Sequence, residues 1–151
     1  MVKRILDATT SDFEQMDRAA LLESVRLAEG RTVCAEVVAI SVPLVHSVTN
    51  AETAAAFGAD LISLNGYDVR HPMVMGAPGK ASLALADLPI PIPADFPLGL
   101  GASISDVKKL VGRPVGTKLD CVPPERRDEF GGRAATVDNA RRAVELGADF
   151  L

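Results

Sequence analysis

Two stretches of the chain repeat one pattern. VTNAETAAAFGADLI (residues 48–62) and VDNARRAVELGADFL (residues 137–151) share Asn, Gly and Asp residues at matching positions, at an offset of 147 − 58 = 89 residues. Each copy reads as a helix with small residues on one face, a glycine where the helix ends, and an aspartate where a strand begins. A helix that packs back on a parallel strand through a right-handed crossover has this form. The repeat therefore predicts an α/β fold made of successive βα units.

Three short runs rich in β-branched residues predict the strands of this fold. They are residues 32–40, 61–66 and 115–122, and ADFL at the end of the sequence begins a fourth. Such runs are typical of strands covered on both faces, and no glycine-rich nucleotide-binding loop follows the first of them. We therefore favour a parallel (βα) barrel of TIM type, with the two copies of the repeat two strands apart. The alternative is a doubly wound open sheet, in which NAxxAxxxGAD is only a common turn.

The chain length bounds how much of a barrel can form. A complete TIM barrel takes about 250 residues, whereas this chain has 151, of which 48% are hydrophobic and only 4% aromatic. We expect residues 1–151 to form a single domain, the N-terminal half of a barrel with about four strands, and hence a truncation. A half-barrel leaves two sheet edges and an apolar inner face exposed, so we expect it to form a homo-oligomer, to bind a complementary half, or to aggregate.

Capping residues predict where the helices begin. Residues 1–31 form an N-terminal helical segment, in which Ser11 and Glu14 have the spacing of a capping box. Asn50 and Ser105 are the expected N-caps of two further helices, because each precedes a run with helical periodicity.

Residues 69–103 are rich in proline and glycine, and only Lys80–Leu88 within them could form a short helix. The segment is too long for an ordinary connection between a strand and a helix. It is either a functional excursion at the rim of the sheet or a surface loop that folds against a neighbour. Met73 and Met75 are expected to anchor it to the domain.

Polar side chains alternate along all three predicted strands. Glu36 lies in the first strand, Ser63 and Asn65 lie in phase in the second, and Lys118 and Asp120 lie in phase in the third. Because alternate residues of a strand face opposite sides of a sheet, these side chains are expected to point into the barrel, and the apolar ones toward the helices. The later residues of each strand lie nearer the carboxyl-terminal rim, where barrel enzymes place their sites.

The candidate site residues divide by chemistry. Proton transfer is expected from Lys118, Asp120, Asp68 and His71. Substrate binding is expected from Asn65 and Ser41. A hard cation such as Mg²⁺ is expected at Glu36, Asp68 and Asp120. The structural alternative is that Glu36 and Lys118 form a buried ion pair that only fills the barrel interior.

Charge and cysteine content bound the partners and the location. The net charge is −4 with dispersed Lys and Arg, so we expect a small-molecule substrate and no nucleic-acid or membrane partner. Cys34 and Cys121 fall in predicted strands without metal-binding spacing, which indicates reduced core residues. The N-terminus is not a secretory signal and no segment is long and apolar enough to span a bilayer, so a cytoplasmic location is expected.

Three stretches together resemble a known bacterial family of (βα)₈-barrel proteins. They are AEVVAISVPLVHSVTNAETAAAFGADLISLNGYDV, RPVGTKLDCVP and the opening LDATTSDF. Members of that family are often labelled as related to phosphoenolpyruvate phosphonomutase, or as haloacid-dehalogenase-like hydrolases. The resemblance covers most of residues 3–68 and 104–151, and NAETAAAFGADLISLNGYDV is its most specific part.

The resemblance implies a (βα)₈ barrel and Mg²⁺-assisted chemistry on a small phosphorylated or 2-oxo acid. Our first hypothesis is therefore a fragment of a barrel enzyme of lyase or mutase type. The alternative is a non-catalytic half-barrel that assembles with a second half or with itself, in which Glu36 and Lys118 are structural.

Overall fold

A computed structural model describes residues 1–46, 48–79 and 96–151 of the chain. Three parallel strands form a sheet in the order β1-β2-β3, which is also their order in the sequence. They are β1 (Cys34–Val38), β2 (Leu61–Asn65) and β3 (Val115–Thr117). Each lies within a predicted strand, although β3 is much shorter than expected. The α/β class is therefore confirmed.

Short helices connect and flank the strands. The α-helices are α1 (Thr10–Phe13), α2 (Arg18–Arg26), α3 (Asn50–Ala56), α4 (Ile104–Val111), α5 (Arg127–Phe130) and α6 (Val137–Glu145). Turns of 3-10 helix lie at Ile5–Asp7, Pro124–Arg126 and Gly131–Arg133. Among the described residues, no helix is both long enough and apolar enough to cross a membrane.

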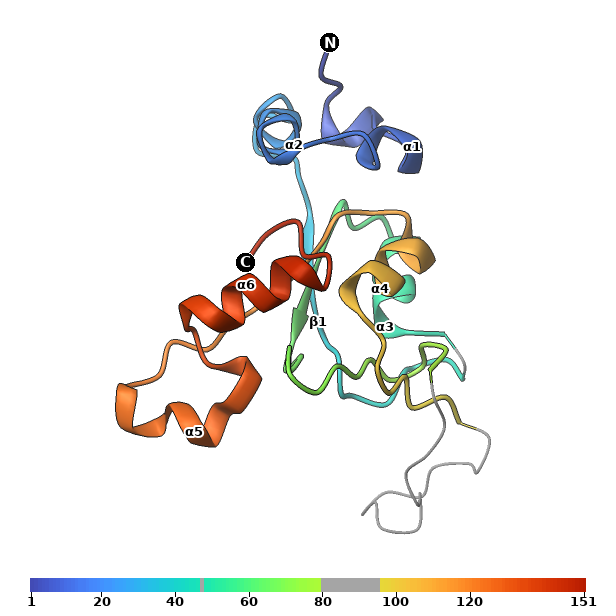
Figure 1. The fold of residues 1–151 in the computed structure, drawn as a ribbon. Helices are drawn as coiled ribbons and strands as arrows, with labels where there is room; N and C mark the ends of the chain where they lie inside the picture. Colours follow the sequence, from blue (N-terminus) through green and yellow to red (C-terminus); the bar gives the residue numbers. More distant parts are fainter. Residues whose placement is uncertain (47, 80–95) are drawn as a thin grey trace.

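Helices α3 and α4 lie side by side against the sheet (Figure 1). Helix α3 contacts β1 and β2, and α4 contacts α3 and β3. The N-terminus of α4 meets the C-terminus of α6, where Ser105 N donates to Leu146 O over 2.8 Å. Helices α1 and α2 instead lie at the end of the sheet where β1 begins (Figure 1).

The main core lies between the sheet and α3 and α4. Ile62 and Leu64 of β2 are fully buried there, together with Val107 of α4 and Val115 of β3. Burying an aliphatic side chain of this size contributes roughly 1.5–3 kcal/mol. Since Ile62 and Leu64 occupy alternate positions of β2, the covered face is the one that the sequence predicted to face the helices.

The other face of the sheet, here called the open face, carries the alternate residues. Cys34, Glu36 and Val38 of β1 are exposed, whereas the intervening alanine and valine contact the core. The prediction that the first strand is covered on both faces is therefore wrong for the described residues. Cys121 is exposed as well, so the prediction that both cysteines are core residues is also wrong. Cys34 lies on the open face, and Cys121 lies beyond the end of β3.

The sequence repeat corresponds to a repeated local structure. Gly58 and Gly147 follow α3 and α6 with φ angles of 96° and 102°, a left-handed conformation that favours glycine. In both copies the glycine N–H donates to the carbonyl three residues earlier, and the next N–H donates to the carbonyl five residues earlier. This is a Schellman motif, which closes the helix before the chain enters the sheet.

Each repeat ends in an aspartate that binds the neighbouring strand. Asp60 Oδ2 accepts from Val33 N over 2.8 Å, and Asp149 Oδ2 accepts from Val115 N over 2.9 Å. The backbone N–H groups of both aspartates donate in return to the carbonyl oxygens of the same valines, over 2.9 Å. The prediction that the aspartate stands at a strand entrance is therefore confirmed for both copies.

A fourth extended segment begins beside β3. Asp149 N donates to Val115 O, and Thr117 N donates to Phe150 O over 3.4 Å. Residues 149–150 thus run alongside β3, where the sequence predicted the start of a fourth strand. A Cβ atom at Gly116 would collide with Phe150, which explains why glycine stands at this position of β3.

The expected N-caps are displaced from the observed ones. The caps are Thr9, Thr49 and Ser103, not Ser11, Asn50 and Ser105, and each forms a capping box with the acidic residue three positions on. The predictions failed because several polar residues adjoin each helix start. Only the residue with extended backbone dihedrals places its side-chain oxygen where it can accept a hydrogen bond from a backbone N–H of the first turn.

The described parts of the proline-rich segment pack against the domain. Met75 is buried with Phe96 and Leu98 in a small second cluster, and Met75 N donates to Ala39 O over 2.9 Å. The expected anchoring by Met75 is therefore confirmed. The helix predicted at Lys80–Leu88 lies outside the described residues.

Candidate functional site

The polar side chains predicted from strand alternation lie together on the open face. Asn65 Nδ2 donates to Glu36 Oε1 over 2.7 Å, which joins β1 to β2. Lys118 follows β3, and its backbone N–H donates to Leu64 O over 3.0 Å. Because Leu64 pairs with Thr117, Asn65 and Lys118 occupy neighbouring positions on the same face. We call Glu36, Asn65 and Lys118 the polar row.

The polar row lies at the carboxyl ends of the strands. Asn65 is the last residue of β2 and pairs with Val38, the last residue of β1. The side chain of Glu36 starts one layer deeper and reaches the amide of Asn65 diagonally. Lys118 is exposed, and no ion pair joins it to another described residue. The polar row therefore combines the Glu36 carboxylate, which is hydrogen-bonded to Asn65, with the exposed ammonium group of Lys118.

Asp68 is committed to local structure. Its Oδ1 accepts from Arg70 N over 2.7 Å and from His71 N over 3.1 Å, and its Oδ2 accepts from Gly132 N over 3.3 Å. A Cβ atom at Gly132 would collide with this carboxylate, so glycine is required for the approach. Asp68 therefore fastens the turn after β2 to the turn before α6, a role that the strand pattern did not predict.

His71 is less constrained than Asp68. Its Nδ1 lies 3.8 Å from Asp68 Oδ2, and 86% of its side chain is exposed. The two residues are close, as their spacing suggested, but this separation is too long for a hydrogen bond.

Asp120 and Ser41 are placed by their backbones. Asp120 N donates to Arg133 O over 2.7 Å, and Ala135 N donates to Asp120 O over 2.8 Å. Asp120 and Asp68 therefore both adjoin the turn formed by residues 131–135. Ser41 is exposed just beyond β1, where its N–H donates to Val38 O over 3.2 Å.

Asn139 organises this region and was not among the predicted site residues. It is only 2% exposed, and its Nδ2 donates to Gly131 O over 2.9 Å and to Ala134 O over 2.8 Å. Its Oδ1 accepts from Arg70 Nε over 3.1 Å. The matching asparagine of the other repeat, Asn50, instead accepts from Leu44 N. The repeat drew attention to both residues, but only the fold shows that one of them is buried.

The three predicted metal ligands are engaged to different degrees. Glu36 binds Asn65, and both oxygens of Asp68 accept from backbone N–H groups, whereas Asp120 is positioned through its main chain. Within residues 1–46, 48–79 and 96–151, no three His, Cys, Asp or Glu side chains come close enough to hold a metal ion together. Mg²⁺ binding stays a prediction.

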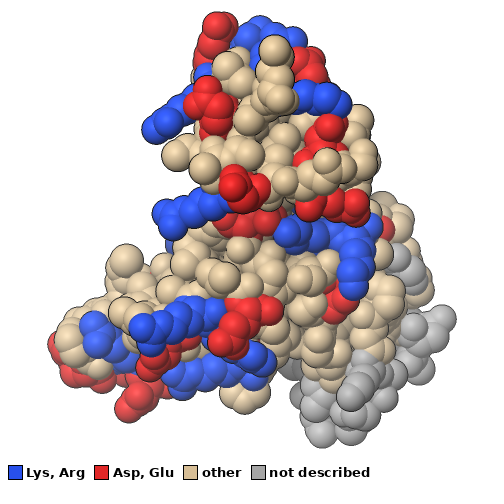
Figure 2. Space-filling view, turned by 45° about the horizontal axis from the view of Figure 1, so that its top comes forward, with Lys and Arg blue, Asp and Glu red and all other residues tan. Residues whose placement is uncertain are grey.

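Charges of both signs are mixed on the surface. Figure 2 shows Lys and Arg side by side with Asp and Glu over the face in view. Among the described residues most ion pairs join neighbours three positions apart in the sequence. Exposed pairs of this kind contribute little to stability, so these charges do not by themselves mark a site.

Comparison with known proteins identifies a family but no activity. No curated protein and no solved structure shows significant similarity to the chain. A family described as a domain of unknown function, DUF7916, matches residues 6–151. Because the match extends over most of the sequence, this α/β chain with a polar row on its open sheet face belongs to the DUF7916 family.

Proposed function

We propose that the chain is the N-terminal half of a (βα)₈ barrel of TIM type. Three features support this fold: the strands are parallel and in sequence order, helices α3 and α4 pack side by side against the sheet, and polar side chains lie on its open face. In such a barrel the open face is the interior, and the carboxyl ends of the strands form the reacting rim.

We further propose that the polar row binds a small phosphorylated or 2-oxo acid for lyase-like or mutase-like chemistry. The observation that carries the proposal is the joint placement of Glu36 on β1, Asn65 on β2 and Lys118 directly after β3. The exposed ammonium of Lys118 suits a carboxylate or phosphate group. Glu36, held by Asn65, is placed to take or return a proton. The resemblance to phosphoenolpyruvate phosphonomutase-related barrels supports this class of substrate.

Mg²⁺ would bind beside the polar row, and protein side chains would supply only part of its ligand shell. In proteins this ion is usually held by one or two carboxylates, with water and substrate oxygens completing the shell. Glu36 or Asp120 can supply such a carboxylate. When bound, the ion would neutralise the charge of the acid substrate.

Thermal unfolding tests the proposed site. Wild-type protein is heated with phosphoenolpyruvate, pyruvate or oxaloacetate, each with and without Mg²⁺. A ligand at 100 times its Kd stabilises the fold by about 2.7 kcal/mol, and each kcal/mol raises Tm by roughly 2–4 °C at this chain length. We expect Lys118→Ala to lose this shift, and Lys109→Ala on α4, which is also exposed, to keep it.

Two outcomes would count against the proposal. If none of the three acids raises the Tm of wild type, the row is not a site for them. If Lys118→Ala is stabilised as much as wild type, the ligand binds elsewhere. Glu36→Gln separates the roles, because removing a proton-transfer group should leave binding largely intact.

A second candidate function is assembly, and the apolar residues near the rim favour it. Val38, Ile40, Leu44 and Val45 are exposed, by 45%, 46%, 86% and 52%. We propose that they contact a second copy or a complementary half-barrel. Sedimentation equilibrium tests the first case: a wild-type dimer that Leu44→Glu dissociates supports self-assembly, and a wild-type monomer at high concentration contradicts it.

We also propose a cytoplasmic location. Both cysteines are free and exposed, which suits a reducing compartment. Targeting of a fluorescent fusion tests this proposal, and export from the cytoplasm would contradict it.

A further inference from the structure

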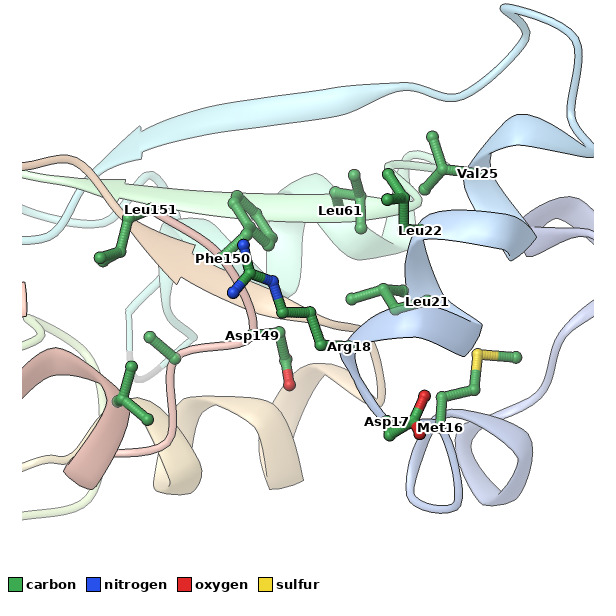
Figure 3. A pocket seen from close by; sticks show the side chains of 12 residues that line it. Met16, Asp17, Arg18, Leu21, Leu22, Val25, Leu61, Asp149, Phe150 and Leu151 are labelled. Carbon is green, nitrogen blue, oxygen red and sulfur yellow. The ribbon is translucent and has the colours of Figure 1, made fainter. Parts of the chain in front are cut away.

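A cavity lies at the opposite end of the sheet from the polar row. Its volume is about 650 Å³, and its walls come from α2, the first residue of β2, the end of α6 and residues 148–151. Figure 3 shows Leu21, Leu22 and Val25 of α2 facing Leu61 and Phe150 across it. Ligand pockets usually have volumes of about 300–1,000 Å³, so the cavity is large enough for a small molecule.

The walls of the cavity are mainly apolar and incompletely covered. Leu22 and Val144, from α2 and α6, are 51% and 62% exposed. Phe150, which lies against Gly116 of β3, also lines the cavity. An alkyl chain placed here would remove apolar surface from water, which is worth about 25 cal/mol for each Å² buried.

The charges that line the cavity leave one cation available. Asp149 is engaged by Lys108 Nζ over 2.6 Å and by Val115 N. The carboxylate of Asp17 caps α2 by accepting from Ala20 N over 2.8 Å. Arg18 forms no ion pair with another described residue, and its guanidinium group extends toward Phe150 (Figure 3). The mouth of the cavity therefore combines a positive group with apolar walls.

We propose that this cavity binds an amphipathic carboxylate, with its alkyl chain against Leu22, Leu61 and Val144 and its carboxylate on Arg18. A guanidinium group donates two parallel hydrogen bonds to a carboxylate, which suits this assignment. The site is separate from the polar row, because Leu61 begins the strand that Asn65 ends. The tests of this cavity are therefore independent of the tests of the polar row.

Titration calorimetry with decanoate tests the site on the full chain. Two pairs of variants provide matched controls on the same helices. Arg18→Ala removes the proposed anchor, whereas Arg26→Ala removes an exposed arginine of α2 that does not line the cavity. We expect Arg18→Ala to raise the Kd for decanoate about tenfold, equivalent to 1.4 kcal/mol, and Arg26→Ala to leave it unchanged.

The second pair tests the apolar wall. Val144→Asp places a charge in the cavity, whereas Val137→Asp changes a valine of α6 that is 67% exposed and lies outside it. Because both valines are largely exposed, both variants should keep the circular dichroism spectrum of wild type. We expect binding to be lost only in Val144→Asp.

Several results would overturn the proposal. Absence of decanoate binding, or equal binding by all four variants, would show that the cavity takes no such ligand. If decanol, which has no carboxylate, bound as tightly as decanoate, Arg18 would not be the anchor of the ligand. A wild-type dimer that only Val144→Asp dissociates would show that a second copy covers the cavity instead.

Discussion

Asp60 and Asp149 show how a single side chain can join a helix to a sheet. Each lies two residues after the glycine that ends a helix, and each binds both backbone groups of a valine at the start of the neighbouring strand. The strand entrance would otherwise leave a backbone N–H group without an acceptor in the protein. The repeat in the sequence is therefore a repeated backbone contact as well as a repeated helix.

Asp60→Ala should destabilise the fold. Asp60 is only 8% exposed, and replacing it with alanine removes the charged acceptor of the Val33 N–H. We expect the free energy of unfolding to fall by about 1–3 kcal/mol, measured by urea denaturation. Asp60→Asn should cost less, because its amide oxygen can still accept. An unchanged urea midpoint for Asp60→Ala would contradict the role assigned to Asp60. Asp138→Ala serves as the control, because Asp138 is exposed.

At the scale of helices, capping by aspartate explains why the predicted starts of α1 and α4 were displaced. A search for Ser or Thr followed by Glu selects Ser11 with Glu14, whereas the helix uses Thr9 with Asp12. Asp106 plays the same part for Ser103 at the start of α4. The shorter acid forms the same two bonds, so the boundary depends on backbone dihedrals that local sequence does not fix.

These capping boxes should make stability depend on acid pH. The ammonium of Lys3 and the N–H and hydroxyl of Thr9 lower the pKa of Asp12 to about 2. The hydroxyl and N–H of Ser103 likewise hold the pKa of Asp106 below its usual value. A carboxylate with a depressed folded-state pKa stabilises the fold above its unfolded-state pKa, and this contribution is lost as the pH falls through the folded-state value.

Urea midpoints measured between about pH 5 and about pH 2 test this dependence. We expect the wild-type midpoint to fall as the pH drops below about 4, and the Asp12→Asn/Asp106→Asn variant to lose less stability over the same interval. Asp138→Asn, which alters an exposed aspartate outside any capping box, should follow the wild-type curve. Parallel curves for all three proteins would show that the capping aspartates do not contribute.

The sequence predicted which face of the sheet a strand residue occupies better than it predicted contacts between loops. Alternation along a strand assigns each side chain to a face, so Glu36, Asn65 and Lys118 could be grouped before the fold was known. Asp68 and His71 lie in a turn, whose contacts depend on the distant Gly132. The burial of Asn139 likewise depends on how residues 131–135 wrap around it.

At the scale of the whole molecule, the two faces of the sheet differ in what covers them. Parallel sheets are usually buried on both faces, yet β1 exposes every second residue. Cys34 is one of these exposed residues, so the reactivity of its thiol can show whether the open face is covered. Partial burial raises the pKa of the Cys34 thiol, and the negative charge of Glu36 raises it further.

Alkylation of Cys34 in a Cys121→Ser background tests the state of the open face. The thiolate is the reactive form, so Glu36→Gln should lower the thiol pKa and speed the reaction at neutral pH by a few-fold. If copies of the chain meet through the open face, the rate at Cys34 should also fall as protein concentration rises. Cys121, followed in a Cys34→Ser background, should react at a constant rate, because it lies beyond β3. A concentration-dependent loss at both thiols would indicate aggregation, and a constant rate at both would show that the open face stays accessible.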